Sequence, residues 1–217
     1  MKKIIFILTV FVFMAGIAQS QDEKTTLGFK PRSYYTFSWN TTFTMGDFNK
    51  WVGNASPAGF DFGGRYNLQG GLVTGFNISW QRISQSYGYQ TAYFTDGSAI
   101  TATNYRFTWM VPFQGVIGYH FIPAKMVSPY ISLGIGGDYM EHHVLIQEFD
   151  IYNTRWDFSL TPEIGALIKF GYFSQWGALV AFNYKWTTNK IDFENYNWTS
   201  KNLQMLNLKV GLTYILR

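Results

Sequence analysis

The chain has 217 residues, enough for one domain, and 20% of them are aromatic while only 14% are charged. Its mean hydropathy is near zero, which excludes a membrane protein built from long apolar helices. The formal charge of +4 falls to +2 without Lys2 and Lys3, and no Lys/Arg cluster indicates nucleic-acid binding.

The N-terminus has the pattern of an export signal. Lys2 and Lys3 precede an apolar run from Ile4 to Ile17, and Ala18-Gln19-Ser20 supplies small residues before a cleavage site. We therefore predict a signal peptide over 1–20 and a short periplasmic tail over 21–33. A membrane anchor helix is the disfavoured alternative, because the run is short for a span. There is no cysteine, so the chain has no disulfide and is not a lipoprotein.

From residue 34 to 217 the sequence alternates between apolar and polar residues in segments separated by turn-forming residues. In the first segment Phe37, Trp39 and Phe43 alternate with Ser, Asn and Thr. This period of 2 predicts strands with one apolar and one polar face. The predicted strands cover 35–45, 58–67, 72–81, 105–121, 131–139, 156–170, 176–186 and 206–216.

The segment 105–121 has the clearest pattern. Its odd positions are aromatic or aliphatic except for Gly115, and its even positions are mixed and include Arg106 and His120. The run is about twice as long as a typical soluble strand. Long strands with an apolar outer face, a polar inner face and aromatic residues near the ends are typical of transmembrane β-barrels.

The connections alternate in length. Long loops are predicted at 46–57, 84–104, 144–154 and 188–202, and short turns at 67–70, 122–129 and 171–175. We therefore predict an all-β fold, an eight-stranded antiparallel up-and-down transmembrane barrel, with both termini at the end of the short turns. The first strand must pair with the last, because unpaired edges are costly in lipid. Side chains fill so narrow a barrel, so no open pore is expected.

Pro112 and Pro162 lie inside predicted strands. Proline has no N–H to donate to a strand ladder. Each therefore predicts a bulge or a missing hydrogen bond.

These features resemble the small outer-membrane β-barrel family of Gram-negative bacteria, the OmpA-barrel and OmpX type. The end of the chain also fits the family's assembly signal, with Lys209, Gly211, Tyr214 and Leu216 at the matching positions, although Arg217 stands where many members have Phe. The resemblance implies a bacterial outer-membrane location. It also implies contact with outer-membrane lipid and lipopolysaccharide, and with the barrel assembly machinery during biogenesis.

The inward face carries most of the charge. We predict a lumen charge network formed by Asp61, Arg65, Arg106, Asp138, Glu163, Lys169, Lys185 and Lys209. Charges in a narrow lumen must pair or stay hydrated, because isolated buried charge is costly. We expect Glu163 to pair with one or more of Arg65, Lys185 and Lys209. The functional alternative is a path for protons or ions.

Glu141-His142-His143 is the only cluster that suggests chemistry. Neighbouring strand residues point to opposite faces, so the two histidines cannot readily share a metal. The His-x-Ser-Asn motif of surface lipid-A deacylase barrels is missing. We therefore predict rim residues here, with contact to lipid headgroups as the alternative, no catalytic, metal or cofactor site, and no enzyme activity.

The predicted external loops are rich in aromatic residues. A possible contact surface for a partner protein or surface glycan comprises Trp51, Tyr87, Tyr89, Tyr93, Tyr152, Tyr196 and Trp198. The alternative is that these rings pack the loops on each other. The function predicted from the sequence is a non-enzymatic outer-membrane barrel with a structural or interaction role, such as a small subunit of a larger outer-membrane complex. The second candidate is a narrow conduit for ions or small hydrophobic molecules, and the third is a surface lipid-modifying enzyme.

Overall fold

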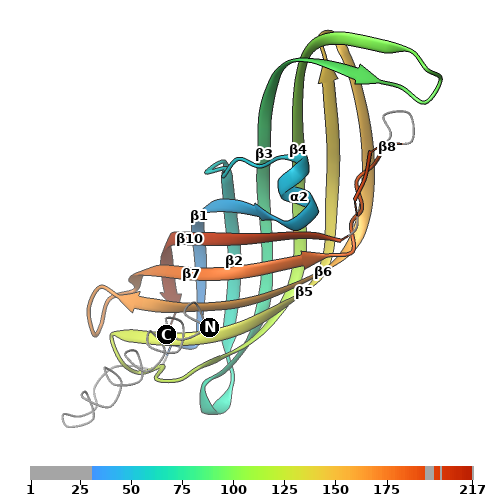
Figure 1. The fold of residues 1–217 in the computed structure, drawn as a ribbon. Helices are drawn as coiled ribbons and strands as arrows, with labels where there is room; N and C mark the ends of the chain where they lie inside the picture. The colour runs from blue at the N-terminus through green and yellow to red at the C-terminus, as the bar shows by residue number, and fades with distance from the viewer. Residues whose placement is uncertain (1–30, 194–197, 201, 217) are drawn as a thin grey trace, which may run out of the picture.

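A computed structural model describes residues 31–193, 198–200 and 202–216, which form one closed antiparallel barrel (Figure 1). The predicted signal peptide and nearly all of the predicted tail lie outside the described residues. Around the barrel the strands follow the order β1-β10-β7-β6-β5-β4-β3-β2. Their bounds are β1 Ser33–Met45, β2 Gly59–Asn67, β3 Leu72–Tyr93, β4 Ala99–His120, β5 Val127–Ile146, β6 Phe149–Lys169, β7 Trp176–Thr187 and β10 Leu203–Leu216.

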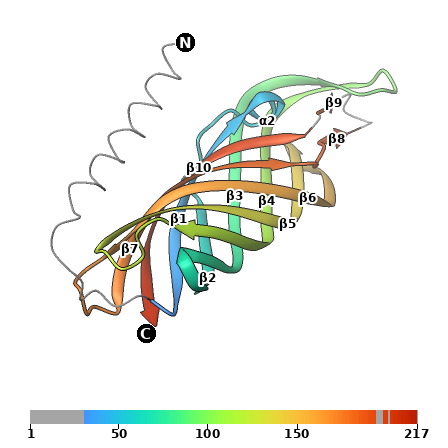
Figure 2. The same ribbon diagram turned by 90° about the horizontal axis from the view of Figure 1, so that it is seen from below.

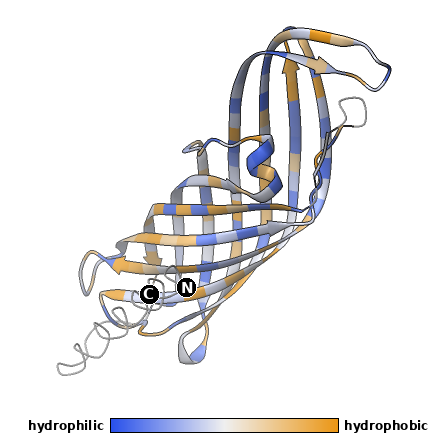
Figure 3. Ribbon diagram, viewed as in Figure 1, coloured by the Kyte–Doolittle hydropathy of each residue, from blue (hydrophilic) through white to orange (hydrophobic). Residues whose placement is uncertain are grey.

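The barrel closes between its first and last strands, as predicted. β1 and β10 pair in continuous register from Ser33↔Leu216 to Met45↔Gln204. The predicted faces are also confirmed, because Phe37 is 61% exposed whereas Ser38 is buried. Apolar and polar residues alternate along the strands (Figure 3). The alternation follows from the pleat of a strand, which sends successive side chains to opposite faces.

Outward Trp and Tyr side chains mark two levels of the barrel wall, called here the apical and the basal row, with outward Phe side chains also between them. The apical row includes the Phe60–Trp80 and Trp80–Trp109 pairs, with ring centroids 5.1 and 5.0 Å apart. The basal row, near the start of β1 and the end of β10, includes Trp176 and Tyr214 at 5.1 Å. On β4 the rows are about ten residues apart, which is the length that a tilted strand needs to cross a hydrocarbon layer.

Four strands continue far beyond the apical row. β3, β4, β5 and β6 have 22, 22, 20 and 21 residues, whereas the other four have 9 to 14. Their outer parts form an open sheet that stands away from the barrel (Figure 1). This apical sheet is defined as residues 82–93, 99–108, 140–146 and 149–155.

The prediction of long loops at 84–104 and 144–154 is therefore wrong for most of these residues, which lie in strands. Their outer face carries Tyr, Thr and Ser in place of aliphatic side chains, a polar composition that favours a loop over a lipid-facing strand. Tyr and Thr still favour strands, and an aliphatic outer face is needed only where the strand meets lipid. The actual connections are the short segments 94–98 and 147–148.

The other two long connections fold over the apical end. The predicted loop 46–57 contains the short helix α2, Gly46–Trp51, and the predicted loop 188–202 contains the hairpin of β8, Asp192–Phe193, and β9, Trp198–Thr199. Figure 2 shows α2, β8 and β9 at the opposite end from the last residues of β10. In the described residues, no helix is long and apolar enough to cross a membrane.

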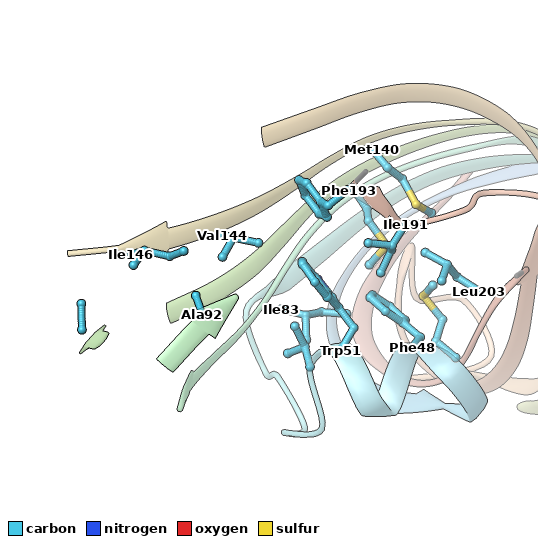
Figure 4. Close-up of a cluster of buried hydrophobic side chains, with 14 residues drawn as sticks. Phe48, Trp51, Ile83, Ala92, Met140, Val144, Ile146, Ile191, Phe193 and Leu203 are labelled. Atoms are coloured by element: carbon cyan, nitrogen blue, oxygen red, sulfur yellow. The ribbon is translucent and has the colours of Figure 1, made fainter. Parts of the chain in front are cut away.

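These connections complete an apical core, an apolar cluster inside the barrel mouth and under the apical sheet (Figure 4). Phe48 and Trp51 enter it from α2, and the Trp51 ring stacks on Phe193 at 5.2 Å. The cluster comprises Phe48, Trp51, Val52, Ile83, Ala92, Ala102, Met110, Met140, Val144, Ile146, Ile191, Phe193, Leu203 and Met205. It gives the four-stranded sheet the apolar packing that such a sheet needs to be stable.

Both prolines interrupt a ladder on one side, which confirms the prediction of missing bonds. Pairing of β6 with β7 stops at Leu160↔Trp186 and resumes at Glu163↔Asn183, so it skips Pro162. Pairing of β3 with β4 skips Pro112 between Ile78↔Phe113 and Gln81↔Met110. On the other side of each proline the register is continuous. A proline can occupy a strand in this way because only one neighbour loses a bond.

Candidate functional site

Lys209 is the centre of the charged lumen. Its Nζ lies 2.8 Å from Asp61 Oδ2 and 3.0 Å from Glu163 Oε2, and all three side chains are at most 7% exposed. These residues come from β10, β2 and β6, so the contact links strands from different parts of the barrel wall. One buried cation between two carboxylates balances part of the cost of burying the three charges.

Neutral side chains complete the hydrogen bonding of the two carboxylates. Asn77 and Ser79 donate to Asp61 at 2.5 and 2.7 Å. Tyr130 and Asn183 donate to Glu163 at 2.9 and 3.2 Å. Charged groups that are buried require such partners, so this part of the lumen is organised as a connected polar core.

A further ion pair lies beside the two at Lys209. Lys185 Nζ is 3.0 Å from Asp138 Oδ2, and Ser159 donates to the other oxygen of this carboxylate. Gln114 in turn donates to Ser159 at 2.8 Å. A cavity of about 10 Å³ lies against Asp61, Glu163 and Lys209, which is room for about one water molecule. The lumen is therefore filled at this level.

The remaining predicted lumen charges have other partners. Arg65 donates to the carbonyl oxygen of Phe76 at 2.6 Å, and Lys169 donates to that of Pro123 at 2.9 Å. The Arg106 guanidinium lies 4.8 Å from the centroid of the Trp51 ring, inside the apical core. The eight predicted residues thus occupy several levels of the barrel, and three ion pairs, two of them at Lys209, bring together five of them.

The histidine cluster occupies both faces of the apical sheet, as the alternation predicted. His143 faces outward, where it stacks on Phe107 with centroids 4.3 Å apart and contacts Asp150 at 3.0 Å. His142 faces inward and is fully buried, so its prediction as a rim residue is wrong. The rim prediction failed because it assumed that β5 ended here. In the described residues no group of three or more potential ligands could hold a metal.

His142 joins a chain of hydrogen bonds. Its Nε2 lies 2.9 Å from Asn189 Oδ1, and its Nδ1 lies 2.9 Å from Thr108 Oγ1. Asn189 donates through Nδ2 to Asp157 at 2.9 Å, which turns the amide oxygen toward the imidazole. Nε2 therefore carries the proton, and Nδ1 accepts one from Thr108. Burial lowers the pKa of His142, in the apical sheet, to about 4, so the imidazole is neutral at pH 7.

The predicted aromatic surface is partly wrong. Trp51 is fully buried, and Tyr87 donates to the Trp51 carbonyl oxygen at 2.7 Å on the inner side. The spacing of Phe48 and Trp51 is that of neighbours on one helix face, a signal that could have revealed their burial. Tyr89, Tyr93 and Tyr152 are on the outer face and are 78%, 70% and 66% exposed. Tyr196 and the side chain of Trp198 lie outside the described residues.

The residues of the predicted assembly signal all lie on β10. Lys209 faces inward to its ion pairs, and Tyr214 faces outward beside Trp176. A Cβ at Gly211 would lie 2.4 Å from the Phe37 carbonyl oxygen, so glycine is needed for the close approach of β1. Leu216 pairs with Ser33 where the barrel closes, and Arg217 lies outside the described residues.

Searches with the sequence found neither a matching family model nor a matching curated protein. Solved structures do match. Neisserial surface protein A has 11% identity over 84% of this chain and 96% of its own, with a TM-score of 0.51. Ail, the attachment invasion locus protein of Yersinia pestis, has 10% identity over 87% and 100%, with a TM-score of 0.49. At these identities, the first of these matches shows a shared fold.

Proposed function

We propose that this chain, which has the fold of the small eight-stranded outer-membrane β-barrels, is a non-enzymatic bacterial outer-membrane protein that presents the apical sheet as a contact surface. The observation that carries the proposal is the length of β3–β6. On β3 about a dozen residues follow the apical aromatic row, a reach of about 40 Å along the strand. The apolar band between the rows supports a location in lipid, surrounded by outer-membrane lipid and lipopolysaccharide.

The outer face of the apical sheet has the composition of a binding surface. Tyr89, Tyr93 and Tyr152 are each at least 66% exposed. Exposed aromatic side chains of this kind are favoured at interfaces because they combine a large apolar area with few rotatable bonds. A stable sheet holds them in place, which lowers the entropy lost on binding.

The interior favours contact over transport. Three buried ion pairs fill the lumen, and the apical core fills its mouth. An ion would have to displace Lys209 or Lys185 from its carboxylate, and a small hydrophobic molecule would have to displace Phe48 and Trp51. The narrow conduit is therefore the second candidate.

The arrangement of Thr108, His142 and Asn189 resembles a hydroxyl nucleophile, its base and an orienting group. All three are fully buried beneath the apical core. No substrate could reach Thr108 without unfolding the sheet around it. This burial supports a structural role for the cluster over surface lipid modification.

The proposal is tested by shortening the apical sheet while keeping the barrel. Residues 90–102 are replaced by Asn-Gly, which closes the hairpin after the Tyr89↔Thr103 pair. Full-length and shortened chains are purified in mild detergent from their own outer membrane and analysed by mass spectrometry. We expect a stoichiometric macromolecule, such as a larger outer-membrane protein, to co-purify with the full-length chain and not with the shortened chain. Identical composition of the two samples would contradict the contact role, and steady single-channel conductance of the full chain would favour the conduit.

A further inference from the structure

The outer wall of the barrel carries a groove of about 640 Å³ between the apical and basal rows, called here the wall groove. It lies between two lines of outward side chains that run across the strands, and its lining is apolar almost throughout. One line comprises Leu72, Tyr119, Ile131, Ile164 and Phe182, and the other comprises Ile117, Leu133, Pro162, Tyr184 and Leu206. The floor is formed by the backbone of residues whose side chains face the lumen, namely Gly118, Ser132, Glu163 and Asn183. A volume of this size is typical of sites that hold a small molecule.

Pro162 lines the wall groove at the place where a strand ladder is interrupted. Pairing of β6 with β7 skips the residues between Leu160↔Trp186 and Glu163↔Asn183, whereas pairing of β6 with β5 is continuous. The wall therefore stays closed here, but the two strands lack their usual bonds on one side, because proline has no N–H to donate. The groove thus crosses the barrel where β6 and β7 are joined least tightly.

The wall formed by β1, β2 and β3 is covered differently, by rings that pack on each other. The Phe62 ring lies 6.3 Å from that of Tyr35 and 5.9 Å from that of Phe76, measured between centroids. A Cβ at Gly64 would lie 2.7 Å from the Phe76 ring and 3.2 Å from the Tyr35 ring. The rings therefore close over the backbone at Gly64, so protein side chains occupy the space that the wall groove leaves free on β4–β7.

The wall groove is continuous with the lipid-facing surface, and Ile117, Ile131 and Phe182 in its lining are 52%, 43% and 51% exposed. From Leu72 on β3 it passes β4, β5, β6 and β7 to Leu206 on β10, and five strand spacings correspond to about 24 Å. A groove across strands tilted by about 45° is itself inclined, so an acyl chain that follows it through a leaflet of about 15 Å covers about 21 Å. We infer that the wall groove binds one acyl chain of a membrane lipid.

The preference for an acyl chain follows from shape. Within the hydrocarbon layer there is no hydrophobic driving force, so association depends on van der Waals packing. A chain in the wall groove contacts both side walls and the floor, whereas a chain on a convex part of the barrel contacts it on one side only. The groove also follows the curve of the barrel, which a flexible chain can do and a rigid ring system cannot. This inference goes beyond the proposed contact role, because it concerns the wall inside the membrane.

The experiment places the full mature chain in vesicles of phosphatidylethanolamine and phosphatidylglycerol. An increasing fraction of the lipid is a phosphatidylcholine that carries a photoreactive diazirine on its acyl chain. After illumination, the cross-linked peptides are quantified by mass spectrometry. We expect labelling of the groove segments 117–119, 131–133 and 162–164 to saturate as the fraction of probe lipid rises, because a site holds one chain. Labelling of 35–39 and 60–66, on the ring-covered wall, should rise in proportion to that fraction.

Two variants fill the wall groove without adding a polar group, Ile131→Trp and, with a smaller added ring, Leu133→Phe. The matched control is Val210→Trp, because Val210 is also β-branched and is 53% exposed on the outer face of β10, outside the groove lining. Circular dichroism checks that each variant forms the barrel. We expect saturable labelling of 162–164 to be lost in both groove variants and kept in Val210→Trp. Proportional labelling of every segment in the wild type, or saturable labelling that survives in a folded groove variant, would overturn the inference and leave the contact role of the apical sheet unaffected.

Discussion

Removing the buried cation Lys209 is the sharpest test of the lumen. Lys209→Met keeps a side chain of similar length but leaves Asp61 and Glu163 buried without their common partner. Both carboxylates contact the same nitrogen within 3.0 Å. Their nearest oxygens are therefore at most about 6 Å apart, and at an effective dielectric constant of about 20 they repel by about 3 kcal/mol. Together with the lost attraction, we expect a loss of about 3–5 kcal/mol in the free energy of unfolding.

Glu163→Gln should cost less. The Lys209–Asp61 contact at 2.8 Å remains, and the amide oxygen of Gln can still accept from Tyr130. One charged hydrogen bond is lost, which corresponds to about 1.5–3 kcal/mol. The wild type should therefore be the most stable, Glu163→Gln less stable and Lys209→Met the least stable.

The control is an exposed ion pair with the same nitrogen–oxygen distance. Lys50 Nζ is also 2.8 Å from a carboxylate, that of Asp47, but the lysine side chain is 70% exposed. Lys50→Met should cost less than about 1 kcal/mol, because water screens surface pairs. The assay is urea unfolding in lipid vesicles followed by tryptophan fluorescence. If Glu163→Gln left stability unchanged and Lys209→Met cost no more than Lys50→Met, the structural role of the ion pairs would be wrong.

Three further predictions concern the outer face, the apical core and pH. Ile117→Arg, on the lipid-facing side, should lower the free energy of unfolding by about 2–4 kcal/mol in the same assay. Gln114→Asn, on the inner side, should lower it much less. Equal losses would mean that the faces are assigned wrongly. Trp51→Ala should cost about 3–5 kcal/mol and expose the apical sheet to protease, whereas a wild-type cleavage rate would argue against the apical core. Folded His142 has a pKa of about 4, below the ordinary 6.5 that it regains on unfolding. The stability that it contributes is thus complete above pH 6.5 and is lost as the pH falls toward 4, and a His142→Asn variant with the same acid sensitivity would contradict this origin.

The strand faces could be predicted because lipid imposes a simple rule. An aliphatic outer residue such as Ile117 alternates with a polar inner one such as Gln114, and this pattern survives in the sequence. Pro112 and Pro162 were also interpreted correctly, because the missing N–H has a local consequence. The apical part of β3 was missed because its outer face meets water, where Tyr89 and Thr91 are as suitable as aliphatic residues.

The choice of ion-pair partners could not be predicted from one sequence. Lys209 and Glu163 belong to strands separated around the barrel by β7, and Asp61 lies on the far side of β1. Which of them meet depends on the tilt and register of several strands together. The burial of Phe48 was missed for a related reason, since α2 is stabilised mainly by its contacts with the barrel mouth and has only six residues.

The interior is polar between the aromatic rows and apolar beyond the apical row, because the outer face of the wall meets lipid in the first part and water in the second. Between the aromatic rows the outer face supplies the apolar contact, so the lumen can hold Lys209, Asp61 and Glu163. Beyond the apical row water lies outside, and the sheet must take its apolar contact from within, through Phe48, Trp51 and the segment after β7. That segment also lies along β6, where Asn153 donates to the Asp192 carbonyl oxygen, whereas the α2 connection returns to β2 at Gly59, well short of the tip of β3. The two sides of the apical sheet therefore differ, since in the described residues the tip of β3 pairs with β4 alone.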